Sequence, residues 1–186
     1  DSRLKKVILI PTTLATAALL ILSALVAAPA GAATKGYRYW GYYQAAPGAT
    51  MWKSAMTGPT VELKDGAVEG WLFTFSSADI PSGAPSVKPN FNAICSKVKA
   101  DVNVIRVGLV IDFGSQVIAP SGEKVRKTIT QCQTLPIESV GLDALADAVK
   151  VRTASSGLIC AFDGYPAKEC GAEITTPAAL TKKSKK

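Results

Sequence analysis

The sequence predicts an α+β fold, in which a single N-terminal transmembrane helix precedes a disulfide-stapled β-α-β-β-α-β domain of the ferredoxin-like type. Three observations predict it. Arg3, Lys5 and Lys6 stand before an uncharged apolar run at 7–28. Strand-like and helix-like hydrophobic patterns alternate over 68–162. The chain contains four cysteines, and an even number in an exported protein is typical of disulfides.

The N-terminal segment has the order of an export signal, with basic residues, an apolar run and small residues at 28–33. The 22 residues of the run rise about 1.5 Å each, enough to cross roughly 30 Å of hydrocarbon. We therefore expect a retained anchor, and cleavage after Ala32 is the alternative. Basic residues stay on the cytoplasmic side, so 1–6 is expected in the cytoplasm. The linker at 29–36 and all later residues are expected outside the cell membrane.

The net charge of +7 lies mostly at the two ends of the chain. Three basic residues precede the apolar run, and four more lie in the tail, namely Lys182, Lys183, Lys185 and Lys186. Without these seven and Asp1, 14 basic and 13 acidic residues remain. This near-neutral domain lacks the basic surface of a nucleic-acid-binding protein. The tail at 177–186 is expected to be disordered, with contact to anionic membrane lipid or to an acidic partner as the alternative.

The exported domain is expected at 37–176 and begins with an extra aromatic strand at 37–43, placed at a sheet edge. Alternating residues predict a strand at 68–75. Three prolines predict a loop at 76–89. Asn90 is expected to cap a helix that extends to about residue 99.

The remaining elements give the domain its predicted topology. They are a buried strand, a half-exposed strand, an amphipathic helix and a last strand, at 102–113, 124–135, 141–152 and 158–162. The first of them is a nearly continuous β-branched run, typical of a central strand. From Val68 onward the order is that of a ferredoxin-like split β-α-β sheet.

The four cysteines allow three disulfide pairings, of which we favour Cys95–Cys132 and Cys160–Cys170. The first would join a predicted helix to a predicted strand, and the second would close a short loop. Zinc is the rival interpretation, but no two cysteines have C-x-x-C spacing and the chain contains no histidine. We therefore expect no metal.

The absence of histidine excludes Ser-His-Asp triads and Cys-His dyads. Phosphate-binding and nucleophile-elbow motifs are also absent, so we expect neither enzymatic activity nor a cofactor. Asp112 and Asp163 each follow a predicted strand. If those strand ends meet, the two carboxylates form a pair suited to acid–base chemistry. Otherwise Asp163 shapes a turn, and Asp112 caps a strand or pairs with Arg106.

The aromatic strand supplies the interaction candidates Tyr39, Trp40, Tyr42 and Tyr43. Side chains alternate along a strand, so Tyr39 and Tyr43 share one face, opposite Trp40 and Tyr42. Aromatic residues close to a membrane settle at lipid headgroups or anchor protein interfaces. One pair is expected in the core and the other free to act.

Four motifs together resemble an uncharacterised family of exported actinobacterial proteins. They are Tyr39-Trp40-Gly41-Tyr42-Tyr43, Asp65-Gly66 with Glu69-Gly70-Trp71, Arg106 to Gly114 and Gly157 to Pro166. The resemblance implies export and paired cysteines but no activity. In some members it also implies a genomic neighbourhood of energy-coupling-factor transporters. By architecture and size alone, the chain is similar to accessory subunits of the actinobacterial cytochrome bcc–aa3 supercomplex.

These observations favour a non-catalytic accessory subunit of a cell-envelope membrane complex, with the respiratory supercomplex as the first candidate. The expected partners are integral membrane subunits and lipid. The alternatives are an exported ligand-binding module that serves an energy-coupling-factor transporter, and a hydrolase that uses Asp112 and Asp163.

Overall fold

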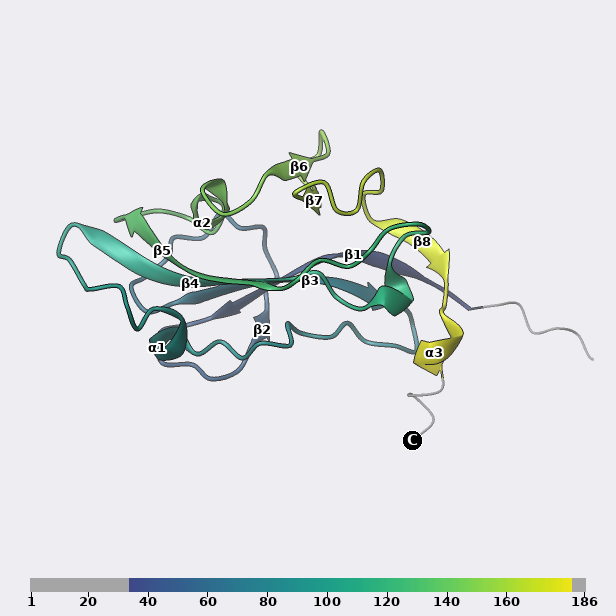
Figure 1. Ribbon diagram of the computed structural model, residues 1–186, viewed down its shortest axis with the longest axis horizontal. Coiled ribbons are helices and arrows are strands. Elements are labelled where there is room, and N and C mark those ends of the chain that lie inside the picture. The colour runs from purple at the N-terminus through teal and green to yellow at the C-terminus, as the bar shows by residue number, and fades with distance from the viewer. Residues whose placement is uncertain (1–33, 182–186) are drawn as a thin grey trace, which may run out of the picture. The chain divides into compact units, whose positions relative to one another are not determined.

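The computed structural model describes residues 34–181, where the chain forms two β-sheets and a few short helices (Figure 1). This confirms a mixed α+β fold, in which strands predominate. The predicted cytoplasmic flank, membrane anchor and Lys-rich end lie at 1–33 and 182–186, outside the described residues. Within the described range, no helix is long and apolar enough to cross a membrane.

The main sheet has six strands in the order β2-β1-β3-β4-β5, with β8 also paired to β1. Their bounds are β1 Lys35–Ala45, β2 Lys53–Ser54, β3 Val68–Ser76, β4 Val104–Asp112, β5 Ile129–Pro136 and β8 Ala172–Thr175. β3 runs antiparallel to β1 and parallel to β4, and β5 runs antiparallel to β4. The aromatic strand β1 therefore lies inside the sheet, not at the edge where the sequence placed it.

The ferredoxin-like topology is wrong. In that topology the last strand of the β-α-β-β-α-β unit joins the main sheet, whereas β7 (Ile159–Phe162) pairs with β6 (Val151–Thr153) in a separate two-stranded sheet. All four residues of β7 are buried, because this small sheet lies on one face of the large sheet and packs its side chains there. The apolar pattern of β7 does indicate burial. Its side chains are buried against a face of the main sheet, and β7 is not a strand within that sheet.

The helices are shorter than the sequence predicted. α1 (Phe91–Ile94) begins with the expected Asn90 cap, whose Oδ1 accepts from the Ala93 N–H at 3.0 Å. It ends after one turn, as does α2 (Asp143–Ala146). Helices of this length have little stability of their own, so tertiary contacts decide where they end. α3 (Ala178–Thr181) forms in the segment that was expected to be disordered, and its Leu180 packs against the core.

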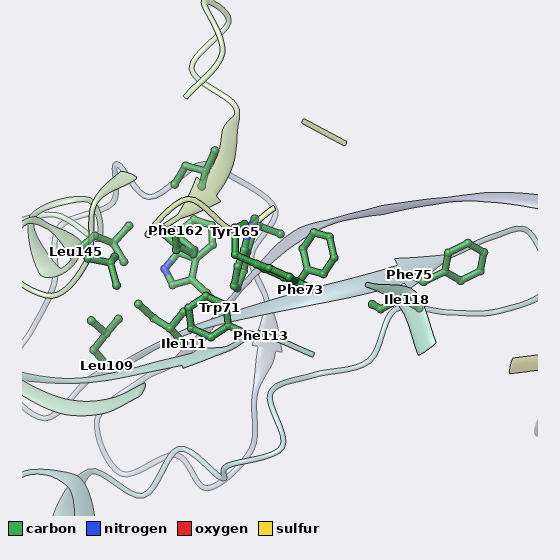
Figure 2. Close-up of a cluster of buried hydrophobic side chains, with 13 residues drawn as sticks. Trp71, Phe73, Phe75, Leu109, Ile111, Phe113, Ile118, Leu145, Phe162 and Tyr165 are labelled. Carbon is green, nitrogen blue, oxygen red and sulfur yellow. Dashed lines mark hydrogen bonds between the residues drawn. The ribbon is translucent and has the colours of Figure 1, made fainter. Parts of the chain in front are cut away.

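The main sheet buries both faces. One face carries the large aromatic core of Figure 2, covered by α2 and the β6–β7 sheet. The other face carries a smaller cluster around Val68 and Val110, covered by α1 and the segment that precedes it. Burial on both faces explains why β4 reads as a continuous β-branched run.

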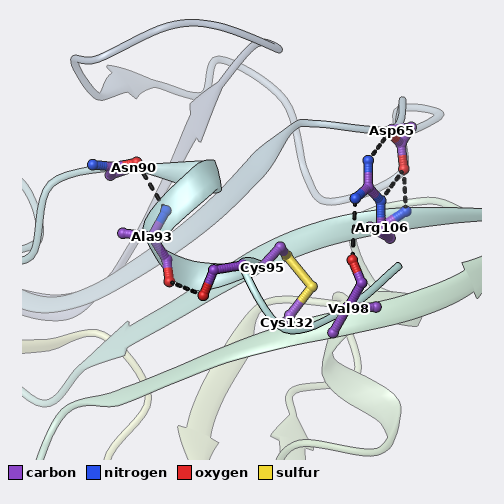
Figure 3. Close-up of a disulfide and its surroundings, with 8 residues drawn as sticks. Asp65, Asn90, Ala93, Cys95, Val98, Arg106 and Cys132 are labelled. Carbon is purple, nitrogen blue, oxygen red and sulfur yellow. Dashed lines mark hydrogen bonds and ion pairs between the residues drawn. A yellow bond between two sulfur atoms is a disulfide. The ribbon is translucent and has the colours of Figure 1, made fainter. Parts of the chain in front are cut away.

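The two predicted disulfides are present, Cys95–Cys132 and Cys160–Cys170. The first ties the end of α1 to β5 (Figure 3). Beside it, Arg106 does not pair with Asp112 but donates to both carboxylate oxygens of Asp65, at 3.0 and 2.8 Å. These hydrogen bonds from Arg106 lower the pKa of the Asp65 carboxyl.

Candidate functional site

An open pocket of about 350 Å³ lies where β1 and β3 meet the small β6–β7 sheet and the loop at 57–59. We call it the aromatic pocket. Its lining is made of Trp40, Tyr42, Thr57, Gly58, Pro59, Trp71, Ser156, Gly157, Leu158 and Ile159. Aromatic and aliphatic side chains with a few polar groups are the usual lining of a binding site.

Three aromatic side chains form the floor of the aromatic pocket. Trp40 and Tyr42 are two residues apart on β1, so they point to the same face of the sheet. Trp71 lies directly opposite Tyr42 in the β1–β3 register. The Tyr42 and Trp71 rings are stacked, with centroids 4.5 Å apart and planes 18° apart. Both tryptophans are almost completely buried.

Phe162 of β7 packs against the floor residues on the same face of the sheet. Its ring packs edge-on against Trp40 at 4.5 Å and against Trp71 at 5.3 Å between centroids. Trp40 Nε1 also donates a hydrogen bond to the Tyr165 carbonyl oxygen at 3.3 Å. Edge-to-face pairs of this kind add about 0.5–1.5 kcal/mol each beyond burial. These contacts hold the two tryptophan rings of the floor against Phe162 and the Tyr165 carbonyl.

The hydroxyl of Tyr42 takes part in a buried polar cluster with Glu69 and Gln44. Tyr42 Oη donates to Glu69 Oε2, and Gln44 Nε2 donates to Tyr42 Oη at 2.9 Å and to Glu69 Oε1 at 3.3 Å. Glu69 is only 1% exposed. Burial raises the pKa of its carboxyl, and the two hydrogen bonds partly oppose that rise. Burial and the nearby Glu69 raise the pKa of the Tyr42 hydroxyl, which stays protonated as the donor.

Gly141 closes the polar cluster at its outer side. A Cβ at this position would lie 2.5 Å from Tyr42 Oη and 2.8 Å from Glu69 Oε2. The next residue, Leu142, donates its N–H to the Pro59 carbonyl oxygen at 2.8 Å. The turn before α2 and the loop at 57–59 are thereby joined over Tyr42. The orientation of Tyr42 is therefore set by Trp71, by the Glu69 cluster and by a glycine that leaves no spare room.

Exposed apolar side chains occur in the lining of the aromatic pocket and in residues adjacent to it in sequence or by a backbone hydrogen bond. Leu158 lines the pocket and is 50% exposed. Leu142, joined to Pro59 by its N–H, is also exposed, and Met56 directly precedes the lining residue Thr57. Of these three residues, only Leu158 belongs to the lining itself.

The two other aromatic candidates lie on the opposite face of the sheet. Tyr43 is buried, and its hydroxyl donates to the Gly83 carbonyl oxygen. The Tyr39 hydroxyl lies 3.2 Å from Ser76 Oγ and is half-buried. The alternation expected from the sequence therefore separates the pairs, with Trp40 and Tyr42 at the aromatic pocket and Tyr39 and Tyr43 away from it.

The structure does not bring Asp112 and Asp163 together. Asp112 Oδ2 accepts from the N–H and hydroxyl of Ser86, in the segment that covers one face of the main sheet. Asp163 Oδ1 accepts from the Lys150 N–H, in the layer on the other face, and Asp163 occupies a turn at φ 50°. Both carboxylates thus act as local structural acceptors, and we make no proposal of hydrolysis.

Glu69, Gln44 and Leu158 are site residues that sequence reasoning missed. Glu69 had a visible signal, since a lone charge in an apolar strand at the same parity as Trp71 must be buried and paired. Leu158 had none, because its place depends on the separate β6–β7 sheet. Within 34–181, no three His, Cys, Asp or Glu side chains are grouped so that they could hold a metal ion.

A family model described as SCO2322-like domain matches residues 32–175. This range includes every residue of the aromatic pocket and both disulfides. No curated protein and no solved structure is significantly similar to the chain.

Proposed function

We propose, from the premise that this chain belongs to the uncharacterised family of SCO2322-like domains, that it is a non-catalytic accessory subunit of a cell-envelope membrane complex. In this proposal the exported domain holds a partner polypeptide at the aromatic pocket. The two disulfides support a location outside the cytoplasm, where such bonds persist.

The observation that carries the proposal is a tightly packed aromatic floor beside the half-exposed apolar side chain of Leu158. Binding energy at protein interfaces concentrates on a few aromatic anchors in preformed pockets. Here Trp40, Tyr42 and Trp71 are already held in place by Phe162 and Glu69. A volume of about 350 Å³ suits one or two side chains of a partner. An apolar or proline side chain of a partner fits this lining best.

The buried carboxyl of Glu69 supports binding and not chemistry. Both of its oxygens accept hydrogen bonds from within the domain, and the group is shielded from solvent. A general acid or base has to reach the proton that it transfers. Glu69 therefore acts on Tyr42, which it orients, and through Tyr42 on whatever rests on the floor.

The cytochrome bcc–aa3 supercomplex is the specific complex that we propose to test first. Its support is the likeness in architecture and size described above. In the same proposal the N-terminal segment anchors the chain in the cell membrane, in contact with integral subunits and lipid.

Purification of the full chain from its own membranes in mild detergent tests this function. We expect a stoichiometric integral membrane partner with the wild type. Leu158→Asp places a charge on the pocket rim and should remove that partner. The matched control is Val117→Asp on the 3-10 helix Gln116–Ile118, since Val117 is 44% exposed and does not line the aromatic pocket. A wild-type chain that purifies alone, or equal loss with both variants, contradicts the proposal.

A second candidate function is the exported ligand-binding module. It is favoured by a second open hollow of about 370 Å³, whose lining includes Glu69, Gln44, Lys53 and Lys64. Native mass spectrometry of the full chain separates the two candidates. A small molecule that leaves only on denaturation favours the ligand-binding module, and a polypeptide partner without such a molecule favours the accessory subunit.

A further inference from the structure

Strand β5 is the long open edge of the main sheet. It pairs with β4 along its whole length, and no described strand lies on its other side. At the opposite end of the sheet, β1 is covered by β2 and β8. An open edge presents a row of unpaired N–H and C=O groups to any strand that can reach it.

The register shows which groups of β5 point outward. Gly108 donates its N–H to Ala67, and Arg106 accepts from Gly66, so the even-numbered residues of β4 turn toward β3. The odd-numbered ones turn toward β5, where they face the odd-numbered residues from Ile129 to Leu135. The backbone groups of Thr130, Cys132 and Thr134 therefore point away from the sheet. Within 34–181, no hydrogen bond reaches any of them.

The β5 edge has few of the features that protect sheet edges from pairing with another chain. Native sheets usually block an edge with charges, proline, a bulge or a covering segment. Between Lys127 and Glu138 there is no charged residue, and the one proline, Pro136, is the last residue of the strand. α1 does not cover the β5 edge. It lies over β4, since a Cβ on Gly108 of β4 would meet Ile94 at 3.4 Å.

We propose that β5 pairs with β5 of a second copy of this chain, antiparallel and about a two-fold axis at Cys132. Thr130 of each copy then faces Thr134 of the other. The three outward N–H groups of each copy donate to the other copy, six hydrogen bonds in all. The two sheets become one continuous sheet, and the interface is isologous, as in most homodimers.

Charge and exposed apolar surface favour a second copy in this orientation. Lys124, Arg126 and Lys127 precede β5, and Glu138 follows it. Antiparallel pairing brings the basic end of each strand to the acidic end of the other, whereas parallel pairing sets the three cations against three cations. The exposed Ile137 lies at the acidic end, beside the partner's incoming chain. Both ends gain a favourable contact at once because of the two-fold symmetry.

Light scattering of the full chain, produced without its proposed membrane partner and purified in mild detergent, tests the proposal. The protein mass should be twice the 19.4 kDa of one chain. Thr134→Pro removes one outward N–H and places a ring on the edge, while the ladder with β4 needs no donor there. It should raise the dimer dissociation constant at least about tenfold. The matched control, Thr134→Ala, keeps the N–H and should stay dimeric.

A second pair of variants keeps the test decisive if Thr134→Pro does not fold. Arg126→Glu on the exposed basic end should weaken the dimer, and adding Glu138→Arg should restore it. A wild-type chain that stays single at every concentration overturns the proposal, as does a different protein bound to the edge. The proposal is also overturned if Thr134→Pro leaves the dimer dissociation constant unchanged, or if neither charge variant changes it.

Discussion

Gly141→Ala is the sharpest test of how Tyr42 is held at the aromatic pocket. The added methyl would lie 2.5 Å from Tyr42 Oη, 2.8 Å from Glu69 Oε2 and 3.1 Å from Pro59 Cβ. These distances are too short for contact, so the hydroxyl and the carboxylate have to move apart or the turn has to shift. Moving the two side chains disrupts the buried Tyr42–Glu69 hydrogen bond, and moving the turn disturbs its packing against Tyr42 and Pro59.

The cost follows from the kind of interaction lost. A hydrogen bond to a charged group contributes about 1.5–3 kcal/mol, and forcing an extra methyl into a packed site costs about 1–3 kcal/mol. Both costs arise from the same displacement and are not added, so we expect Gly141→Ala to lower the free energy of unfolding by about 2 kcal/mol. For a chain of this size that lowers the melting temperature by about 4–8 °C.

Thermal unfolding followed by near-ultraviolet circular dichroism measures this loss and reports on the aromatic floor. Gly58→Ala is the matched control, because Gly58 lines the same pocket and a Cβ there would meet nothing within 4 Å. It should change the melting temperature by less than 2 °C, given a typical surface effect within about 0.5 kcal/mol. Equal melting of Gly141→Ala and the wild type refutes the packing argument.

The remaining predictions concern stability. Burial raises the pKa of Glu69 above its usual 4.5, so the folded chain holds this proton at pH values where the unfolded chain has lost it. Wild-type stability should therefore fall relative to Glu69→Gln as pH rises above about 4.5, and urea unfolding that shows the opposite trend contradicts this. Removing Cys95–Cys132 should cost about 1 kcal/mol more than removing Cys160–Cys170, because their sequence separations are 37 and 10. Paired alanine variants in guanidinium measure this, and the reverse order contradicts it.

Strands β1, β3 and β4 of the main sheet were predictable because their residues meet two layers of core, whereas the short strands β2 and β8 were not predicted. β1, β3 and β4 have aromatic and β-branched residues on both faces, and no helical period fits them. The disulfide pairing was predictable because Cys160 and Cys170 close a short loop, which leaves Cys95 and Cys132 to join a helix to a strand. Elements whose burial can be read from their own residue pattern are therefore predictable from the sequence.

The topology and the helices were not predictable because they depend on contacts distant in sequence. Residues 141–152 have a helical pattern, yet Val151 and Arg152 pair with β7. The burial that made β7 look like the last strand of a main sheet comes from its position over Trp40 and Trp71. A periodic pattern states that a side chain is buried, and it does not state against which partner.

The candidate site was half predictable for the same reason. Strict alternation placed Trp40 and Tyr42 on one face, and that holds. The pocket itself needs the loop at 57–59 and the β6–β7 sheet, whose positions over β1 no local pattern encodes.

Photo-crosslinking in intact cells tests the central claim that the aromatic pocket holds a partner polypeptide. p-Benzoylphenylalanine in place of Leu158 should give one strong crosslinked band, and mass spectrometry should identify an integral membrane protein in it. The same residue in place of Val117 should give little of that band. Equal yields at the two positions, or no crosslink at Leu158, contradict the claim.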